Sequence, residues 1–259
     1  MVAVYIILGL IAAALFVTFV VRAAIAAEER RKLRIEEMRS FAHGLGLDFT
    51  EQQDPYHDEH YAHFELFRQG FDRNAYNTAW GEIVHNGRTF GINCGDFTYK
   101  TRETYTTTDS KGRTQTRTRI VTHHFSYFIL ELNIRNIPDL LIRREGLFDR
   151  IASAFGKDDI DFESAAFSRR YFVKCDDRKF AYDLIHPRMM EFMLQTRPGL
   201  VDMENSRICL SGGYSTWPAS QFAQTLDWLQ RFIDHWPAFV FKDLERADHT
   251  SSPQPDRIR

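Results

Sequence analysis

The stretch "NTAWGEIVHNGRTFGINCGDFTYKTRETYTT" (residues 77–107) carries the strongest hairpin signal in this chain. Two runs rich in β-branched and aromatic residues flank Asn86 and Gly87, and this pair is favoured in two-residue hairpin turns because both positions need a positive φ. The stretch therefore predicts two antiparallel strands. After a polar loop, "TRTRIVTHHFSYFILELNI" (residues 116–134) predicts a long third strand, since β-branched and aromatic side chains suit a pleated surface.

The second half of the chain mixes short strands with helices. Composition and turn residues predict strands or hairpins at residues 139–146, 168–175 and 199–212. Helices are expected near residues 147–155 and over residues 177–195, the latter interrupted at Pro187. A meander of strands followed by interspersed helices indicates an α+β fold with a largely antiparallel sheet.

An amphipathic helix is predicted to open at Pro218 near the C-terminus. Its apolar side chains recur at i, i+4, i+7, i+11 and i+14, which makes one stripe on a 3.6-residue period. They are Phe222, Leu226, Leu229, Ile233 and Trp236. We expect this stripe to cover one face of the sheet. The polar residues 247–259 are predicted to be a disordered tail.

The N-terminal run "VAVYIILGLIAAALFVTFVV" (residues 2–21) contains no charge. Twenty residues of helix at about 1.5 Å each span about 30 Å, the thickness of a bilayer core. A cleaved signal peptide is the alternative, and "AAIAA" after Arg22 resembles a cleavage site. However, the run is long and no basic residue precedes it. We therefore predict a transmembrane anchor over residues 1–22 that contacts the lipid bilayer through residues 2–21.

Basic residues follow this run but do not precede it: Arg22, Arg30, Arg31, Lys32, Arg34 and Arg39. The positive-inside rule then predicts a single-pass protein of the inner (plasma) membrane, with its N-terminus outside and its main domain in the cytoplasm. The first five are also candidates for contact with anionic headgroups at the membrane surface. Residues 23–45 are expected to be a juxtamembrane helix or linker, residues 46–246 the α+β domain.

Overall composition narrows the functional classes. The formal net charge is −2 and the pI about 6.6, so nucleic-acid binding, which favours a basic excess, is not predicted. The three cysteines are odd in number and contain no CxxC, which favours free buried thiols over a disulfide framework or a zinc knuckle. Neither GxxxxGK[ST] nor GxGxxG occurs, and no cofactor is predicted.

Residues 64–194 also resemble a known group of proteins. The segments "LFRQGFDRNAYNTAWGE" (66–82), "FTYKT" (97–101), "TRIV" (118–121) and "DIDFESAAFSRRYFV" (159–173) carry the resemblance. They are similar to a bacterial family of membrane-anchored proteins of unknown function, which have N-terminal hydrophobic segments before one α+β domain. Near "ILELNIRNIPDLLIRRE" (129–145) the chain departs from that family, whose members more often carry two prolines there. The resemblance implies an architecture and no catalytic residue.

The segment "YHDEHYAHFELFRQG" (56–70) places His57, His60 and His63 close together in the sequence. A zinc site needs three or four ligands that converge on one point. If Asp54 and Pro55 begin a helix there, side chains at i, i+3 and i+6 drift around its axis; in a strand, the middle histidine points away from the others. HExxH is absent. The three histidines are therefore the metal candidates, but exposed or edge histidines are the favoured interpretation.

Asp158, Asp159 and Asp161 in "KDDIDFES" (157–164) are the candidates for carboxylate chemistry. Such groups hold Mg²⁺ or act as acid and base. No phosphate-binding loop accompanies them, and turn or cap roles are the commoner use of such residues.

No nucleophile, base and stabiliser occur together in the sequence. The prediction is therefore a non-enzymatic binding or scaffold domain, tethered at the cytoplasmic face of the membrane and acting through a protein partner. One alternative is a membrane-associated metal-dependent hydrolase that uses the aspartates and histidines above. Another is a module that senses anionic lipids through the juxtamembrane basic residues and "RTQTRTR" (113–119).

Overall fold

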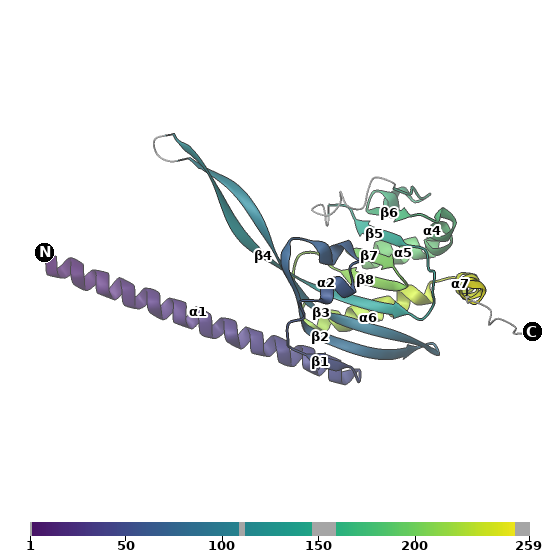
Figure 1. Ribbon diagram of the computed structural model, residues 1–259, viewed down its shortest axis with the longest axis horizontal. Helices are drawn as coiled ribbons and strands as arrows, with labels where there is room; N and C mark the ends of the chain where they lie inside the picture. Colours follow the sequence, from purple (N-terminus) through teal and green to yellow (C-terminus); the bar gives the residue numbers. More distant parts are fainter. Residues whose placement is uncertain (1, 109–111, 147–158, 252–259) are drawn as a thin grey trace, which may run out of the picture.

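The computed structural model describes residues 2–108, 112–146 and 159–251. An α+β fold, as predicted, follows a long N-terminal helix (Figure 1). One antiparallel sheet has the strand order β1-β2-β3-β4-β8-β7-β5-β6. The strands are β1 (Asp48–Thr50), β2 (Phe71–His85), β3 (Arg88–Thr108), β4 (Thr114–Leu132), β5 (Leu140–Arg144), β6 (Tyr171–Cys175), β7 (Leu200–Glu204) and β8 (Arg207–Ser211). The helices are α1 (Val2–Gly44), α2 (His57–His60), the 3-10 helix η1 (Glu65–Arg68), α3 (Ala165–Ser168), α4 (Arg178–Leu184), α5 (Pro187–Thr196), α6 (Ala219–Asp234) and α7 (Ala238–Ser251).

The predicted hairpins are confirmed. Strands β2 and β3 turn at Asn86 and Gly87, whose φ angles are 49° and 74°. Strands β7 and β8 turn at Asn205 and Ser206, with φ of 50° and 60°. These positive φ values explain why residues with short polar side chains or glycine occupy the turns.

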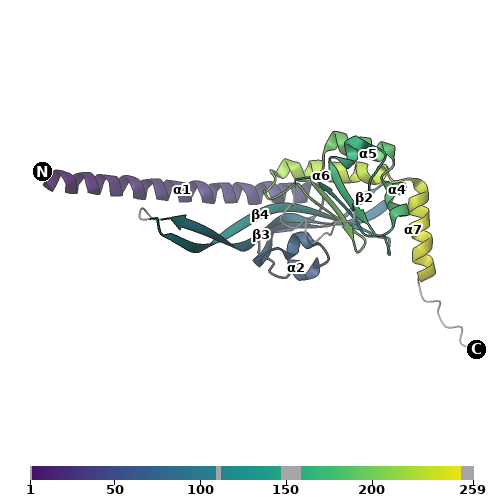
Figure 2. The same ribbon diagram turned by 90° about the horizontal axis from the view of Figure 1, so that it is seen from above.

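Strands β3 and β4 are longer than predicted. Pairing continues to Thr108↔Thr114, so most of the expected polar loop is strand. Threonines alternate with longer side chains there, and β-branched residues favour extended backbone. We call residues 101–108 and 114–121 the β3–β4 arm. The arm projects beyond the rest of the sheet toward the same side as the N-terminal half of α1 (Figures 1 and 2).

The sheet has helices on both faces (Figure 2). On one face, α4, α5 and α6 pack over a core that includes Phe128 and Leu130. On the other, α2 and η1 pack over a second, aromatic core with Phe125, Tyr127 and Ile129. Successive residues of β4 thus alternate between the two cores, as the period of a strand requires.

The apolar stripe predicted for the amphipathic helix is confirmed in α6 and the residues that follow it. All five side chains of the predicted stripe are buried in the first core. The chain then turns through Pro237 into α7, where Val240 and Leu244 are buried one helical turn apart. Because α7 continues to Ser251, residues 247–251 of the predicted disordered tail are helical. The helix expected near residues 147–155 lies outside the described residues.

Helix α1 is continuous from the apolar run into the domain. It ends at Gly44, and Gly46 adopts a φ of 71°, so the glycine stop signals act as predicted. Within the described residues, α1 is the one helix long and apolar enough to cross a membrane. Apolar side chains such as Leu10, Leu15 and Phe19 are exposed in its N-terminal part, whereas Ile35, Met38 and Ala42 near its C-terminus are buried.

Candidate functional site

The C-terminal half of α1 is fixed to the sheet by a buried ion pair. The guanidinium of Arg34 donates from Nη2 to Oδ1 of Asp96 at 2.8 Å and from Nε to Oδ2 at 3.1 Å. Asp96 lies in β3 and is 1% exposed. Two further donors reach the same carboxylate, Asn77 Nδ2 at 3.2 Å and Ser126 Oγ at 2.6 Å. With four charge-assisted hydrogen bonds, the cost of burying this charge is offset within the chain.

Local backbone geometry makes this network possible. A register shift between Tyr76 and Ala79 interrupts β2, and Asn77 has a φ of 50°. Such a bulge re-aims a side chain, here that of Asn77 toward Asp96. Beyond the carboxylate, Ser126 Oγ accepts from the backbone N–H of Trp217 at 2.8 Å. The network therefore joins α1, the three strands β2, β3 and β4, and the loop before α6.

The basic residues proposed to meet headgroups divide into two kinds. Arg22, Arg30, Arg31 and Lys32 lie on the exposed surface of α1, with Arg31 paired to Glu28 at 3.0 Å. Arg34 instead faces the sheet, where its guanidinium also lies 5.3 Å from the ring of Phe222. Its position in the fold thus assigns it to Asp96. The signal that sequence analysis missed is the stripe Ile35, Met38, Ala42 beside it, which marks a helix face that packs.

The three candidate metal histidines have separate environments. His57 is 2% exposed and packs against the rings of Tyr61, Phe67 and Tyr127. Burial lowers its pKa to about 3, so the ring is neutral at pH 7. His60 is exposed, and His63 is half-buried with its pKa lowered to about 4, chiefly by burial. In the described residues, no three His, Cys, Asp or Glu side chains are placed to hold one metal ion.

The helix expected around these histidines is shorter than predicted and begins later. Only His57–His60 is helical, and its N-cap is Tyr56, without a side-chain hydrogen bond. The carboxylate of Asp54 accepts from the Tyr56 N–H at 2.9 Å, which forms a turn before the helix.

The candidate aspartates include one clear structural group. Asp159 Oδ1 accepts from the backbone N–H of Val173 at 2.8 Å. This bond satisfies a donor at the sheet edge. Asp161 is exposed, and Asp158 lies outside the described residues.

The three cysteines are free and buried, as predicted. Burial raises the pKa of each thiol, most strongly for Cys94 and Cys209. They are therefore thiols at pH 7 and unreactive as nucleophiles.

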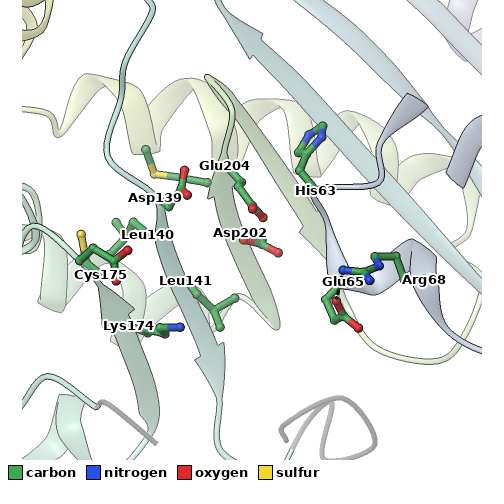
Figure 3. Close-up of a pocket in the computed structure, with 12 residues that line it drawn as sticks. His63, Glu65, Arg68, Asp139, Leu140, Leu141, Lys174, Cys175, Asp202 and Glu204 are labelled. Carbon is green, nitrogen blue, oxygen red and sulfur yellow. Dashed lines mark hydrogen bonds and ion pairs between the residues drawn. The ribbon is translucent and has the colours of Figure 1, made fainter. Parts of the chain in front are cut away.

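A pocket that sequence analysis did not identify lies on the face shared with α2 and η1 (Figure 3). We call it the acidic pocket. Its volume is about 230 Å³. It is lined by His63, Glu65, Arg68, Asp139, Leu140, Leu141, Lys174, Cys175, Asp176, Asp202, Met203 and Glu204. Strand β7 supplies Asp202 and Glu204 to the same face because they are two residues apart.

Three carboxyl groups of the acidic pocket, those of Asp139, Asp202 and Glu204, have pKa values raised above their ordinary values. Burial raises the pKa of Asp202 well above its ordinary range, and the charges of Glu204, Asp139 and Glu65 raise it further. Glu204 has its pKa raised to about 7, first by burial and then by Asp139 and Glu65. In the part of the chain that the structure describes, no hydrogen bond or ion pair reaches the Asp202 carboxyl. The pocket therefore contains a deeply buried acid without a donor.

Comparisons with known proteins give a likeness at the level of structure. No family model matches this chain, and no curated protein matches it significantly. Among solved structures, the chain is similar to the mycobacterial trehalose monomycolate transport factor A, TtfA, with a TM-score of 0.48 and 15% identity. The likeness covers 78% of this chain and 96% of that one. At this level it does not extend to function, and the resemblance to a family of membrane-anchored proteins stays a prediction.

Proposed function

We propose that this protein is a non-enzymatic binding or scaffold protein that α1 tethers to a membrane. The observation that carries the proposal is the continuity of α1. Its exposed apolar part suits a bilayer, and its last turns are joined to the sheet by the Arg34–Asp96 pair. A helix joined in this way holds the domain in a fixed orientation to the membrane, which is useful to a protein that presents a surface to a partner.

The proposed topology is single-pass, with the N-terminus outside and the domain in the cytoplasm of a bacterium, at the inner membrane. Its support is the cluster of basic residues that follows residues 2–21. The division into residues 1–22, 23–45 and 46–246 belongs to this proposal. Ile35, Met38 and Ala42 of the middle segment are buried, and this packing supports a rigid connection between the anchor and the domain.

The direction of the β3–β4 arm supports a second candidate role, contact with anionic lipid. From Asp96 to Thr108 the strand covers about 40 Å at about 3.3 Å per residue. From Arg34 back to Val21 the helix covers about 20 Å at 1.5 Å per residue. Both start at the same ion pair and run to the same side (Figure 1). The arm is thus long enough to reach the membrane surface with its basic side chains, Arg102, Arg117 and Arg119, and with Arg113 next to it.

Labelling of intact cells tests the topology. The native cysteines are buried, so a membrane-impermeant maleimide should report on single introduced cysteines. We expect Val2→Cys to react in intact cells and Thr106→Cys, on the exposed arm, to react only after lysis. Reaction of Thr106→Cys in intact cells would reverse the proposed orientation. Recovery of the full-length protein from the soluble fraction would contradict the tether itself.

Crosslinking in the membrane tests the scaffold role. Full-length protein should yield a reproducible, near-stoichiometric protein partner by mass spectrometry. Substrate turnover by the purified full-length protein, lost in a folded Asp159→Asn variant, would instead favour the metal-dependent hydrolase.

A further inference from the structure

We propose that the acidic pocket binds one organic cation, an ammonium or guanidinium group, presented by a small amine or by a Lys or Arg side chain of a protein partner. This inference deepens the proposed binding function, because it names the chemistry that the tethered domain recognises. It rests on the geometry of the pocket. Carboxyl groups from four segments of the chain line one small cavity, and Asp202, the most deeply buried, has no partner in the described residues.

The size of the pocket limits the occupant to a small group. Its volume of about 230 Å³ is below the roughly 300–1,000 Å³ of pockets that enclose drug-sized ligands. The aliphatic side chain of Leu141 lies on the face of the pocket, whereas Leu140 and Met203, which also border it, pack into the core of the opposite face. Leu141 offers an apolar contact to the methylene stem of a Lys or Arg side chain, whose charged end then meets the acids.

The charges of the lining select a cation. Five carboxyl groups face two basic side chains, Arg68 and Lys174. Of these two, Arg68 is already paired with Glu65 at 3.1 Å. A buried carboxylate without a donor is costly, and a cationic donor would remove that cost. The occupant that relieves Asp202 is therefore positively charged and donates hydrogen bonds.

The arrangement of the acids favours an organic cation over a metal ion. A metal ion needs several ligands that converge within a little over about 2 Å of one point. In the described part of the pocket no three acidic or histidine side chains do so. Figure 3 shows Asp202 and Glu204 between Asp139 on one side and Glu65 on the other. Ammonium carries three donors and guanidinium five, spread over a wider group, which suits acids that stand apart.

Binding should strengthen as the pH rises. The groups that face Asp202 are Glu204 on its own strand, Asp139 before β5, Lys174, Cys175 and Asp176 at the end of β6, and His63, Glu65 and Arg68 beside η1. The pKa values of Glu204 and Asp139 are raised along with that of Asp202. A cation binds the deprotonated acids, so occupancy at about pH 8 should exceed that at about pH 6.

The test uses the full-length protein in detergent with n-butylammonium or methylguanidinium chloride at millimolar concentration. Sodium chloride at equal ionic strength is the reference. We expect the melting temperature to rise by about 2–4 °C for the wild type. The Asp202→Asn variant should fold and show no rise. Asp48→Asn changes an exposed aspartate on β1, which lies far from β7, β5 and β6 in the strand order; it is the matched control and should respond like the wild type.

One further measurement, the binding of a peptide, separates the two sources of the cation. A short peptide with one Arg among glycines that binds at least about tenfold more tightly than methylguanidinium would indicate a partner's side chain. Equal or weaker binding of the peptide would indicate a free amine. No thermal shift in the wild type, or an equal shift in Asp202→Asn, would overturn the proposal. Maleimide labelling of Val2→Cys and Thr106→Cys tests the tether independently, so failure of the pocket proposal and failure of the proposed function are distinguishable.

Discussion

Asp96 and Asp202 lie on one sheet and are 1% and 5% exposed, yet their surroundings are opposite. Asp96 accepts four hydrogen bonds from Arg34, Asn77 and Ser126. Asp202 receives none from the described residues and faces other acids. Burial alone therefore does not decide what a carboxyl group contributes. Hydrogen-bond donors make Asp96 a structural residue. Asp202 has no such donors in the described residues, so its carboxyl group can still accept hydrogen bonds from an occupant of the pocket.

The largest expected effect follows from removing the donor of the first pair. Arg34→Met leaves the methylene packing but strands a buried charge at Asp96, so the free energy of unfolding should fall by about 3–5 kcal/mol. Denaturant unfolding of the full chain, followed by tryptophan fluorescence, measures the loss. Adding Asp96→Asn should recover part of it, because the stranded charge is then gone. A loss below about 1 kcal/mol would mean that the pair contributes little to the junction.

Because of the acidic pocket, the free energy of unfolding should fall as the pH rises. A salt-bridged acid has the opposite effect. Glu204 has a folded-state pKa of about 7 against an ordinary value of 4.5. The stability that its protonated form contributes is present below about pH 4.5 and is lost as the pH rises to about 7. After discounting for its partial exposure, we expect a loss of about 1–2 kcal/mol across this window. A flat profile in the Glu204→Gln variant would assign the loss to this residue, whereas an unchanged slope would assign it elsewhere.

The amide substitutions at the two aspartates should differ in sign. Asp202→Asn removes a group that burial keeps from ionising, and we expect it to raise the free energy of unfolding at about pH 8 by about 1 kcal/mol. Asp96→Asn should lower it, because Arg34 then loses a charged acceptor. Paired unfolding curves at one pH provide the measurement. If both variants are destabilised equally, the two carboxyl groups do not differ in their contribution to stability as proposed.

Local sequence signals predicted much of this fold, and non-local contacts explain what they missed. The pair Asn86-Gly87 and the stripe from Phe222 to Trp236 act through near neighbours, so each appears in the sequence. Arg34 and Asp96 are 62 residues apart, and no local pattern marks them as partners. From the sequence alone, Arg34 is one more basic residue after the apolar run, and the prediction for it is therefore a contact with lipid headgroups.

The acidic pocket was missed for the same reason. Asp202 stands between Val201 and Met203, a pattern typical of a strand with one face in water. Its burial arises from the strands on either side and from η1, which approaches from about 130 residues earlier in the chain. The histidines were noticed by their spacing, yet His57 proved to be an aromatic-core residue.

The smallest expected effect concerns an acid on the β3–β4 arm that is paired, like Asp96, but exposed to water. Glu103 accepts from Arg119 at 2.9 Å, in a pair where both side chains are more than a third exposed. Water and salt screen such a pair, so Glu103→Gln should lower the free energy of unfolding by at most about 1 kcal/mol. The same change frees one arginine on an arm that projects to the same side as the N-terminal half of α1, toward the proposed membrane. Flotation with liposomes rich in anionic lipid should then increase in low salt and return to the wild-type level in high salt. An increase that salt does not reverse would mean that the arm contacts lipid through its exposed apolar side chains, Tyr105 and Ile120, and not through charge.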